Sequence, residues 1–283
     1  MKTTILIAAV IILSGFIWKN DIMGLFNSGN GIKKKYDPST QITIKAQWEL
    51  PEILREVSGI AYLGNDRFAC VQDELGTIFI FNKVTRQIER EIIFTGPGDF
   101  EGIAVKGNTA YVVRSDGKLF EVDMLTKKTK EYDIGSAIIQ NIEGLCYDAK
   151  NNRLLFAGKN QDLALPGYKG IYAFDITGTR FINEPVFKIK LEDLEQANQG
   201  SKKHRLLMPS AIGIHPLTND LFIIDGPKAR LLILDSKGNI KSPYELGTGF
   251  AQPEGITFTP QGDIFISNEG KRNAANIIQV EIE

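Results

Sequence analysis

Cysteine and histidine are scarce in this chain, with two residues of each among 283. Cys70 and Cys146 lie in separate apolar segments, which favours buried thiols over a disulfide and gives no support to cysteine catalysis. His204 lies in a polar stretch and His215 precedes a turn, and no nucleophile-elbow serine motif is present for either to serve. The sequence therefore gives little support to catalysis or metal binding by histidine or cysteine.

An excess of basic charge is missing as well. The formal net charge is −1 and the isoelectric point is near 6.2, with one dense basic run, Lys33–Lys35. This charge balance argues against a nucleic-acid partner, which selects a clustered basic surface. The sequence also lacks a phosphate-binding loop, a dinucleotide fingerprint and zinc-ligand spacing. Helical periodicity is limited to one short stretch, LEDLEQANQ from Leu191.

The chain has one long apolar run, from Thr3 to Trp18, preceded by Lys2 and followed by charged residues. The run is shorter than the roughly 20 residues of a standard membrane span. It predicts either a signal peptide or an uncleaved anchor over residues 1–20, and a polar, glycine-containing linker over 21–40. We therefore expect a folded domain at 41–283, held at the plasma membrane on the extracytoplasmic side or secreted to the periplasm.

Five segments of the chain follow one pattern. Each opens with a small-aliphatic strand, continues through a polar turn into a second apolar strand, and adds a third strand rich in Ile, Phe and Leu. A more polar fourth strand often follows. The pattern recurs about every 40–50 residues, apart from one longer gap. The five segments begin with VSGIAY at Val57, FEGIAV at Phe100, IEGLCY at Ile142, PSAIGI at Pro209 and PEGITF at Pro253.

Short strands in fours at this period are typical of a β-propeller blade. The sequence predicts an all-β propeller of four-stranded blades, favours five blades and leaves a sixth open. We assign the longer gap to an insertion between Gln161 and Leu207. The last repeat shows only three strands, so the lone strand Gln41–Leu50 is predicted to complete it and to remove an exposed sheet edge.

The head position of each repeat is unusual for the start of a buried strand. It holds Ser58, Glu101, Glu143, Ser210 and Glu254. First strands line the channel of a propeller, so the three glutamates are expected to face one another, where like charges need compensation. Three arrangements remain open: a hard cation such as Ca²⁺, pairing with basic residues, or capping of backbone N–H groups.

A further ring of polar residues is predicted where the second strands end. Its members are Asp73, Arg114, Lys159, Asp225 and Glu269. Arg114 and Lys159 are placed to neutralise two of the glutamates or to hold an anionic ligand. The sequence therefore predicts metal ligands at the three head glutamates and a ligand-binding ring around them.

The combination of VSGIAY, VQDELGTIF, GPGDFEGIAV and QPEGITFTPQGDIFISNEG resembles the SdiA-regulated (YjiK-like) family of bacterial β-propeller proteins. The resemblance covers about Trp48 to Glu283. It implies a propeller that is exported or attached to the plasma membrane, and it implies no established biochemical activity. The pattern is more distantly similar to phytase-like, NHL and gluconolactonase-like propellers, several of which hold Ca²⁺ at the axis. That similarity adds weight to a cation at Glu101, Glu143 and Glu254.

Three functions are consistent with these residues. The first is a binding propeller whose axial channel takes a small molecule or an envelope component, with Ca²⁺ as cofactor. The second is a metal-assisted hydrolase of phosphoesters or lactones, with Glu101 or Asp73 as base and Arg114 or Lys159 holding an anion. The third is a protein–protein interaction platform that uses rim loops such as those around Tyr168 and Lys202. The sequence leaves open whether the chain is an enzyme.

Overall fold

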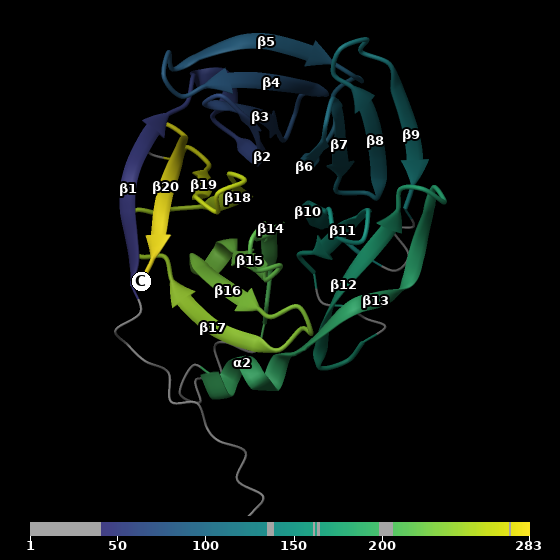
Figure 1. The fold of residues 1–283 in the computed structure, drawn as a ribbon, viewed down its shortest axis with the longest axis vertical. Helices are drawn as coiled ribbons and strands as arrows, with labels where there is room; N and C mark the ends of the chain where they lie inside the picture. Colours follow the sequence, from purple (N-terminus) through teal and green to yellow (C-terminus); the bar gives the residue numbers. More distant parts are fainter. Residues whose placement is uncertain (1–40, 135–138, 161, 163–164, 198–205, 272) are drawn as a thin grey trace, which may run out of the picture. The chain divides into compact units, whose positions relative to one another are not determined.

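Five four-stranded antiparallel sheets surround a common axis in the computed structural model (Figure 1). The structure describes residues 41–134, 139–160, 162, 165–197, 206–271 and 273–283. The predicted signal or anchor segment at 1–20 and the linker at 21–40 lie outside this range. The prediction of an all-β propeller is confirmed, and the described residues form five blades.

Within each blade the strands follow the chain from the axis outward. Blade 1 contains β2 (Val57–Gly64), β3 (Arg67–Gln72), β4 (Thr77–Asn82) and β5 (Gln87–Ile93). Blade 2 contains β6 (Phe100–Lys106), β7 (Thr109–Arg114), β8 (Lys118–Asp123) and β9 (Thr129–Asp133). Blade 3 contains β10 (Ile142–Asp148), β11 (Arg153–Gly158), β12 (Tyr168–Asp175) and β13 (Arg180–Lys190). Blade 4 contains β14 (Pro209–Ile214), β15 (Leu221–Asp225), β16 (Arg230–Leu234) and β17 (Ile240–Glu245).

Blade 5 is assembled from both ends of the described chain. Its strands are β18 (Pro253–Phe258), β19 (Ile264–Asn268), β20 (Asn276–Ile282) and β1 (Ile42–Glu49). The outermost strand, β1, runs antiparallel to β20, with Ile42 opposite Ile282 and Glu49 opposite Asn276. The predicted closure by the segment Gln41–Leu50 is therefore confirmed, and it joins the two ends of the ring.

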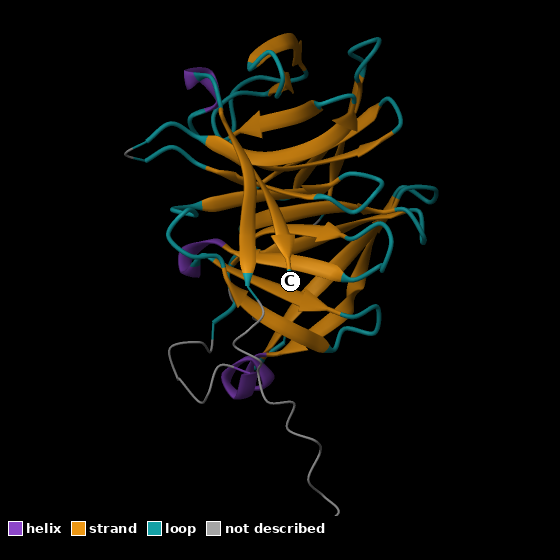
Figure 2. Ribbon diagram, turned by 60° about the vertical axis from the view of Figure 1, so that its left-hand side comes forward, coloured by secondary structure: helices purple, strands orange, loops and turns teal. Residues whose placement is uncertain are grey.

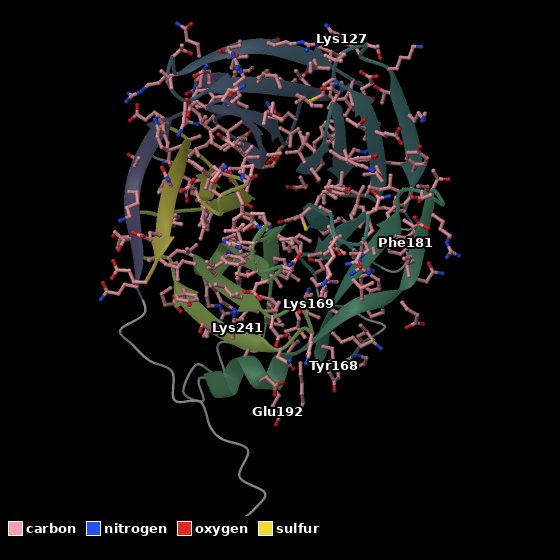
Figure 3. The ribbon with its side chains drawn as sticks, in the orientation of Figure 1. Lys127, Tyr168, Lys169, Phe181, Glu192 and Lys241 are labelled. Carbon is pink, nitrogen blue, oxygen red and sulfur yellow. The ribbon has the colours of Figure 1, made fainter. Side chains whose placement is uncertain are left out.

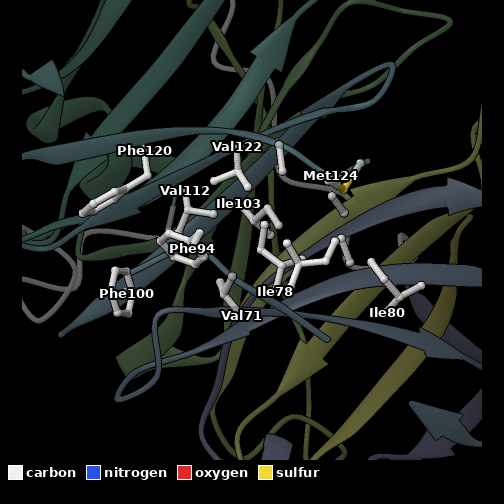
Figure 4. Close-up of a cluster of buried hydrophobic side chains, with 14 residues drawn as sticks. Val71, Ile78, Ile80, Phe94, Phe100, Ile103, Val112, Phe120, Val122 and Met124 are labelled. Atoms are coloured by element: carbon white, nitrogen blue, oxygen red, sulfur yellow. The ribbon is translucent and has the colours of Figure 1, made fainter. Parts of the chain in front are cut away.

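The hydrophobic core is divided among the junctions between neighbouring blades. Because strand side chains alternate between the two faces of a sheet, each blade presents an apolar surface to both neighbours. Figure 4 shows one junction, where Val71 and Ile78 of blade 1 pack against Ile103 and Val112 of blade 2. Equivalent clusters occupy the other four junctions. The blades are thus held together mainly by burial of apolar surface.

Blade 3 differs from the sequence prediction. The segment between Gln161 and Leu207, expected to be an insertion, contains the third and fourth strands of the blade, β12 and β13. The extra length comes from a long fourth strand of 11 residues and from α2 (Leu191–Ala197), which follows it directly (Figure 2). The short helix expected in LEDLEQANQ is confirmed as α2.

Within the described residues, the two cysteines and His215 have structural roles. Cys70 and Cys146 are free and buried, and burial raises the pKa of both thiols. The Nδ1 atom of His215 accepts a hydrogen bond of 3.3 Å from the Thr218 amide, which stabilises the turn. His204 lies outside the described residues. No helix in the described part of the chain has the length and apolarity needed to cross a bilayer.

Candidate functional site

Each inner strand carries a β-bulge at its head position. In blade 3, Ile142 pairs with Gly158 and Gly144 pairs with Ala157, so Glu143 is left without a partner residue in the ladder. The same shift falls on the head position of the other four blades. A bulge re-aims the side chain of the extra residue. All five head residues therefore line one small cavity on the axis, where the sequence predicted them to meet.

The two serine heads bind the backbone of the next blade. Ser58 Oγ donates a hydrogen bond of 2.5 Å to the carbonyl oxygen of Phe100. Ser210 Oγ donates a hydrogen bond of 2.7 Å to the carbonyl oxygen of Pro253. Both hydroxyls are therefore hydrogen-bonded to neighbouring blades. The ionisable members of the head ring are the three glutamates.

Glu143 is paired through one of its two oxygens. Its side chain is 2 % exposed, and Oε1 lies 2.8 Å from the Lys159 ammonium. Asn141 Nδ2 donates a second hydrogen bond of 2.9 Å to the same Oε1. Oε2 is buried and has no hydrogen-bond partner within the described residues. Burial alone would lower the pKa of Lys159, but the hydrogen bond to Glu143 and the charges of Glu143, Glu254 and Glu101 together outweigh burial and raise that pKa.

The remaining carboxyl groups around this cavity resist ionisation. Burial, followed by repulsion from Glu143 and other carboxylates, raises the pKa of Glu101 to about 9. Burial and the same glutamate raise the pKa of Glu254 to about 7. Burial and the nearby Glu269 raise the pKa of Asp73 to about 7. Lys159 thus neutralises Glu143, whereas burial and mutual repulsion favour the protonated forms of Glu101, Glu254 and Asp73.

The predicted second ring does not converge as a whole. Asp73, Lys159 and Glu269 interact electrostatically with the head glutamates or with one another. Arg114 instead forms an ion pair with Asp116, Nη2 to Oδ2, at 2.7 Å.

Asp225, the fifth member of that ring, is held in a different environment. It is fully buried, with its Oδ2 atom 2.6 Å from Nη2 of Arg230. The nearby Lys169, on β12 of blade 3, is also buried, and its ammonium donates to the carbonyl oxygen of Gly158 at 3.0 Å (Figure 3). Asp225 therefore belongs to a buried polar cluster beside the channel.

Sequence reasoning overlooked a further position, two residues before each head, which is polar in four of the five blades. It holds Glu56, Asp99, Asn141, Met208 and Gln252. Asn141 binds Glu143, and the charge of Asp99 contributes to the raised pKa of Glu101. Gln252 donates a hydrogen bond from Nε2 to Glu269 and another to Glu254. The recurrence of polar residues two places before the heads was the available signal.

An aliphatic ring lies directly beyond the heads along the channel. Its members, two residues after each head, are Ile60, Ile103, Leu145, Ile212 and Ile256. All five line the cavity of the heads, and all but Ile212 also line a second, larger cavity on the other side. Each is at most 6 % exposed. The ring therefore separates two chambers, a narrow acidic one and a wide one, and it limits the access of water to the glutamates from one side.

The raised pKa values predict that alkaline pH destabilises the protein in the absence of added cations. The folded state holds protons on Glu101, Glu254 and Asp73 that the unfolded chain releases near pH 4, so the free energy of unfolding falls as pH rises from about 5 to about 9. A pKa difference of one between the folded and unfolded states corresponds to about 1.4 kcal/mol of stability for one group. Because the three carboxyl groups are partly solvated, their contributions are much reduced, and we expect the free energy of unfolding to fall by a total on the order of 2 kcal/mol.

Urea unfolding at pH 5, 7 and 9 with a chelator present measures this loss. The Glu101→Gln variant, whose side chain does not titrate, should show a shallower dependence on pH. A free energy of unfolding that stays constant or increases over this range contradicts the prediction.

The oxygen donors at this end suit a hard cation by type. The described residues contain no group of three His, Cys, Asp or Glu side chains already arranged to hold a metal ion. The feature that fits a cation is the buried Oε2 atom of Glu143, which lines the acidic chamber and lacks a donor among the described residues. That chamber measures about 10 Å³, which is room for a guest the size of an ion or a water molecule.

A family model described as SdiA-regulated matches residues 33–272 of the chain. A search of curated proteins finds no match.

Several solved structures share the fold. Glutaminyl cyclase from Myxococcus xanthus is 13 % identical, with a TM-score of 0.61, over 86 % of this chain and 97 % of the cyclase. A protein of unknown function from Bacteroides thetaiotaomicron is 14 % identical, with a TM-score of 0.52, over 83 % of this chain and 56 % of that protein. Streptogramin B lyase is 12 % identical, with a TM-score of 0.51, over 86 % of this chain and 98 % of the lyase. At these identities the likeness concerns the fold.

Proposed function

The chain belongs to the SdiA-regulated family, and we propose that it is a binding propeller whose acidic chamber takes a Ca²⁺ ion. Glu101, Glu143 and Glu254 would supply carboxylate oxygens to the ion. The ion would in turn give the channel mouth an electrophilic point for a small molecule or an envelope component.

The observation that carries this proposal is the buried Oε2 atom of Glu143, which has no hydrogen-bond partner among the residues that the structure describes. A buried carboxylate oxygen without a donor costs free energy, because burial removes its hydration. The side chain is only 2 % exposed and lines the same cavity as Glu101 and Glu254. A cation in that cavity would satisfy this oxygen and would offset the burial and the repulsion that raise the pKa of both neighbours.

Rotation of side chains would be needed to bring the three carboxylates onto one ion. The carboxylates lie apart because, without a counter-charge, they repel one another. Since the head residues already share one cavity, no change in the backbone path is required. Ca²⁺ suits such a site better than Mg²⁺, because it accepts irregular geometry and completes its shell with carbonyl oxygens and water.

We expect Ca²⁺ to raise the melting temperature of the purified domain and to bind with a stoichiometry of one ion per chain. Ligands that bind only the folded state stabilise it by mass action, about 2.7 kcal/mol at a concentration 100 times the dissociation constant. Binding should also release protons near pH 7, because the ion selects the ionised form of the glutamates. Isothermal titration in two buffers of different ionisation enthalpy measures both the affinity and the proton release.

Two variants and one control sharpen this test. Glu143→Gln and Glu254→Gln should each weaken Ca²⁺ binding at least tenfold. Glu91→Gln, on the exposed face of the outer strand β5, changes the net charge equally and should leave binding unaltered. Absence of a Ca²⁺-dependent shift in melting temperature, or equal binding by all variants, refutes the cation site.

Attachment to the membrane through residues 1–20 is part of the same proposal, and it is supported by the apolar run from Thr3 to Trp18. Fractionation of cells that express the chain with and without residues 1–20 tests it.

A further inference from the structure

The wide chamber on the other side of the aliphatic ring is a separate cavity of about 610 Å³. The inner strands start at the acidic chamber and end here, where Leu63, Tyr147, Ile214 and Phe258 lie near their last residues. All five blades contribute to its wall. Its volume falls within the range of about 300–1,000 Å³ typical of small-molecule sites.

The wall of the wide chamber is largely apolar and carries a single charge. Strand residues such as Ile103, Val105 and Ile256 form its sides, together with Pro216 and Pro260 from the turns. No acidic residue is among its lining residues in the described chain. The one charged lining residue is Lys150, in the exposed turn after β10.

Lys150 is placed to meet a ligand at the rim. Asp148, the acidic residue nearest to it in the chain, is held by Arg153, whose Nε atom lies 2.9 Å from Oδ2. The ammonium group of Lys150 is thus available to a molecule that enters from solvent, whereas that of Lys106, 5.6 Å from the ring centroid of Tyr147, donates a hydrogen bond to Asn152. Thr257 adds a polar group to the wall, since its Oγ1 accepts a hydrogen bond of 3.0 Å from the Tyr62 amide and its hydroxyl proton is left to donate.

The distribution of charge in the wide chamber favours one orientation for an anion. An unpaired negative group loses its hydration against the apolar strands, whereas at the rim it stays hydrated and is attracted by the ammonium group of Lys150. An apolar body, in contrast, is favoured against the strands and the aliphatic ring. The wide chamber therefore combines a deep apolar wall with a single cationic rim.

We propose that the wide chamber binds an amphiphilic monocarboxylate, with its hydrocarbon body against the inner strands and its carboxylate at Lys150. This site does not depend on the cation site, because the two cavities share only aliphatic residues of the ring that separates them and no polar side chain lines both.

Isothermal titration of the purified domain with sodium decanoate, below its micelle-forming concentration, tests the proposal. We expect saturable binding of one decanoate per chain. Decyltrimethylammonium, with the same hydrocarbon chain and the opposite charge, should bind at least fivefold more weakly. Each measurement is made in the presence of a chelator and again with Ca²⁺, so that failure of the cation site and failure of this one are distinguished.

Substitutions at the rim and in the wall test the two halves of the site. Lys150→Glu should weaken decanoate about tenfold, whereas Lys127→Glu, at the outer edge of blade 2 (Figure 3), should leave it unchanged. Leu63→Trp and Val105→Trp, from two different blades, should each reduce binding at least tenfold by filling the cavity. Val84→Trp, on a turn where the valine is 68 % exposed, serves as the control for the added indole.

The proposal is overturned if decanoate shows no saturable binding to the folded wild-type domain. It is also overturned if decyltrimethylammonium binds as tightly as decanoate, or if a folded Leu63→Trp or Val105→Trp variant binds decanoate as the wild type does. Thermal unfolding of each variant confirms that it is folded before its titration is interpreted.

Discussion

A chain that begins at Pro51, and so lacks β1, is expected to lose its cooperative folded state. The deletion removes the outer ladder of blade 5, in which seven residues of β1 pair with β20. It also removes Trp48, which packs against the cluster between blades 5 and 1 and lies 6.1 Å from the ring of Phe265. Lost hydrogen bonds at about 1 kcal/mol each and a lost aromatic contact together cost roughly 5–10 kcal/mol. A loss of this size equals the whole stability of a typical domain.

Circular permutation provides a matched control for that deletion. The amide of Glu283 donates a hydrogen bond of 3.2 Å to the carbonyl oxygen of Gln41, so the two ends of the described domain meet at one sheet edge. Moving Gln41–Leu50 behind Glu283 through a short Asn-Gly linker would turn β20 and β1 into a hairpin. Near-ultraviolet circular dichroism and urea unfolding should show a folded protein for the permuted chain and for a chain starting at Pro38. A cooperative transition in the chain that begins at Pro51 would show that four complete blades fold without closure.

Arg230→Met is expected to cost about 3–5 kcal/mol, which is the largest effect we foresee for a single substitution. The guanidinium of Arg230 is 1 % exposed and lies 2.6 Å from Asp225 Oδ2, and that carboxylate is fully buried. Removal of the arginine leaves the carboxylate with the more distant ammonium groups of Lys228, at 3.6 Å, and of the nearby Lys169. A buried charge whose nearest partner has gone retains its desolvation cost without the compensating attraction. The melting temperature should fall by about 10 °C, given 2–4 °C per kcal/mol for domains of this size.

A double-mutant cycle separates the charge effect from the loss of packing. The Asp225→Asn and Arg230→Met substitutions together should cost less than the sum of the two separately, because neither charge is then left alone. Lys118→Met breaks an exposed pair with Glu131 and should change stability by no more than about 1 kcal/mol. Additive costs for Asp225 and Arg230, measured by urea unfolding, would contradict a coupled pair.

The fold could be predicted from sequence because its rules are local and repeated. Five heads at similar spacing, each followed by an apolar strand and a polar turn, define the blades without knowledge of any contact between them. The lone strand at Gln41 could be placed because the last repeat was one strand short. Blade 3 was harder, since the irregular segment before Tyr168 and the long β13 obscured its period.

The candidate site could be predicted only in outline. The sequence located Glu101, Glu143 and Glu254 on the axis, but it could not show that each is the extra residue of a bulge. Ion pairing was the least predictable part, because Arg114 and Lys159 occupy similar places in the repeat and find different partners. Arg114 turns to Asp116 two residues away, whereas Lys159 reaches back to Glu143 in the first strand of its own blade. Such choices depend on side-chain reach and on the loops, which a repeat pattern does not encode.

Assembly of one blade from both ends of the chain constrains how the protein is made. While the ribosome synthesises the middle of the chain, β1 is already present but its pairing partner β20 does not yet exist. The nascent polypeptide therefore carries an unpaired strand edge until β20 is synthesised, and such edges recruit other strands. A chaperone that shields this segment would have to stay bound until β20 has been synthesised.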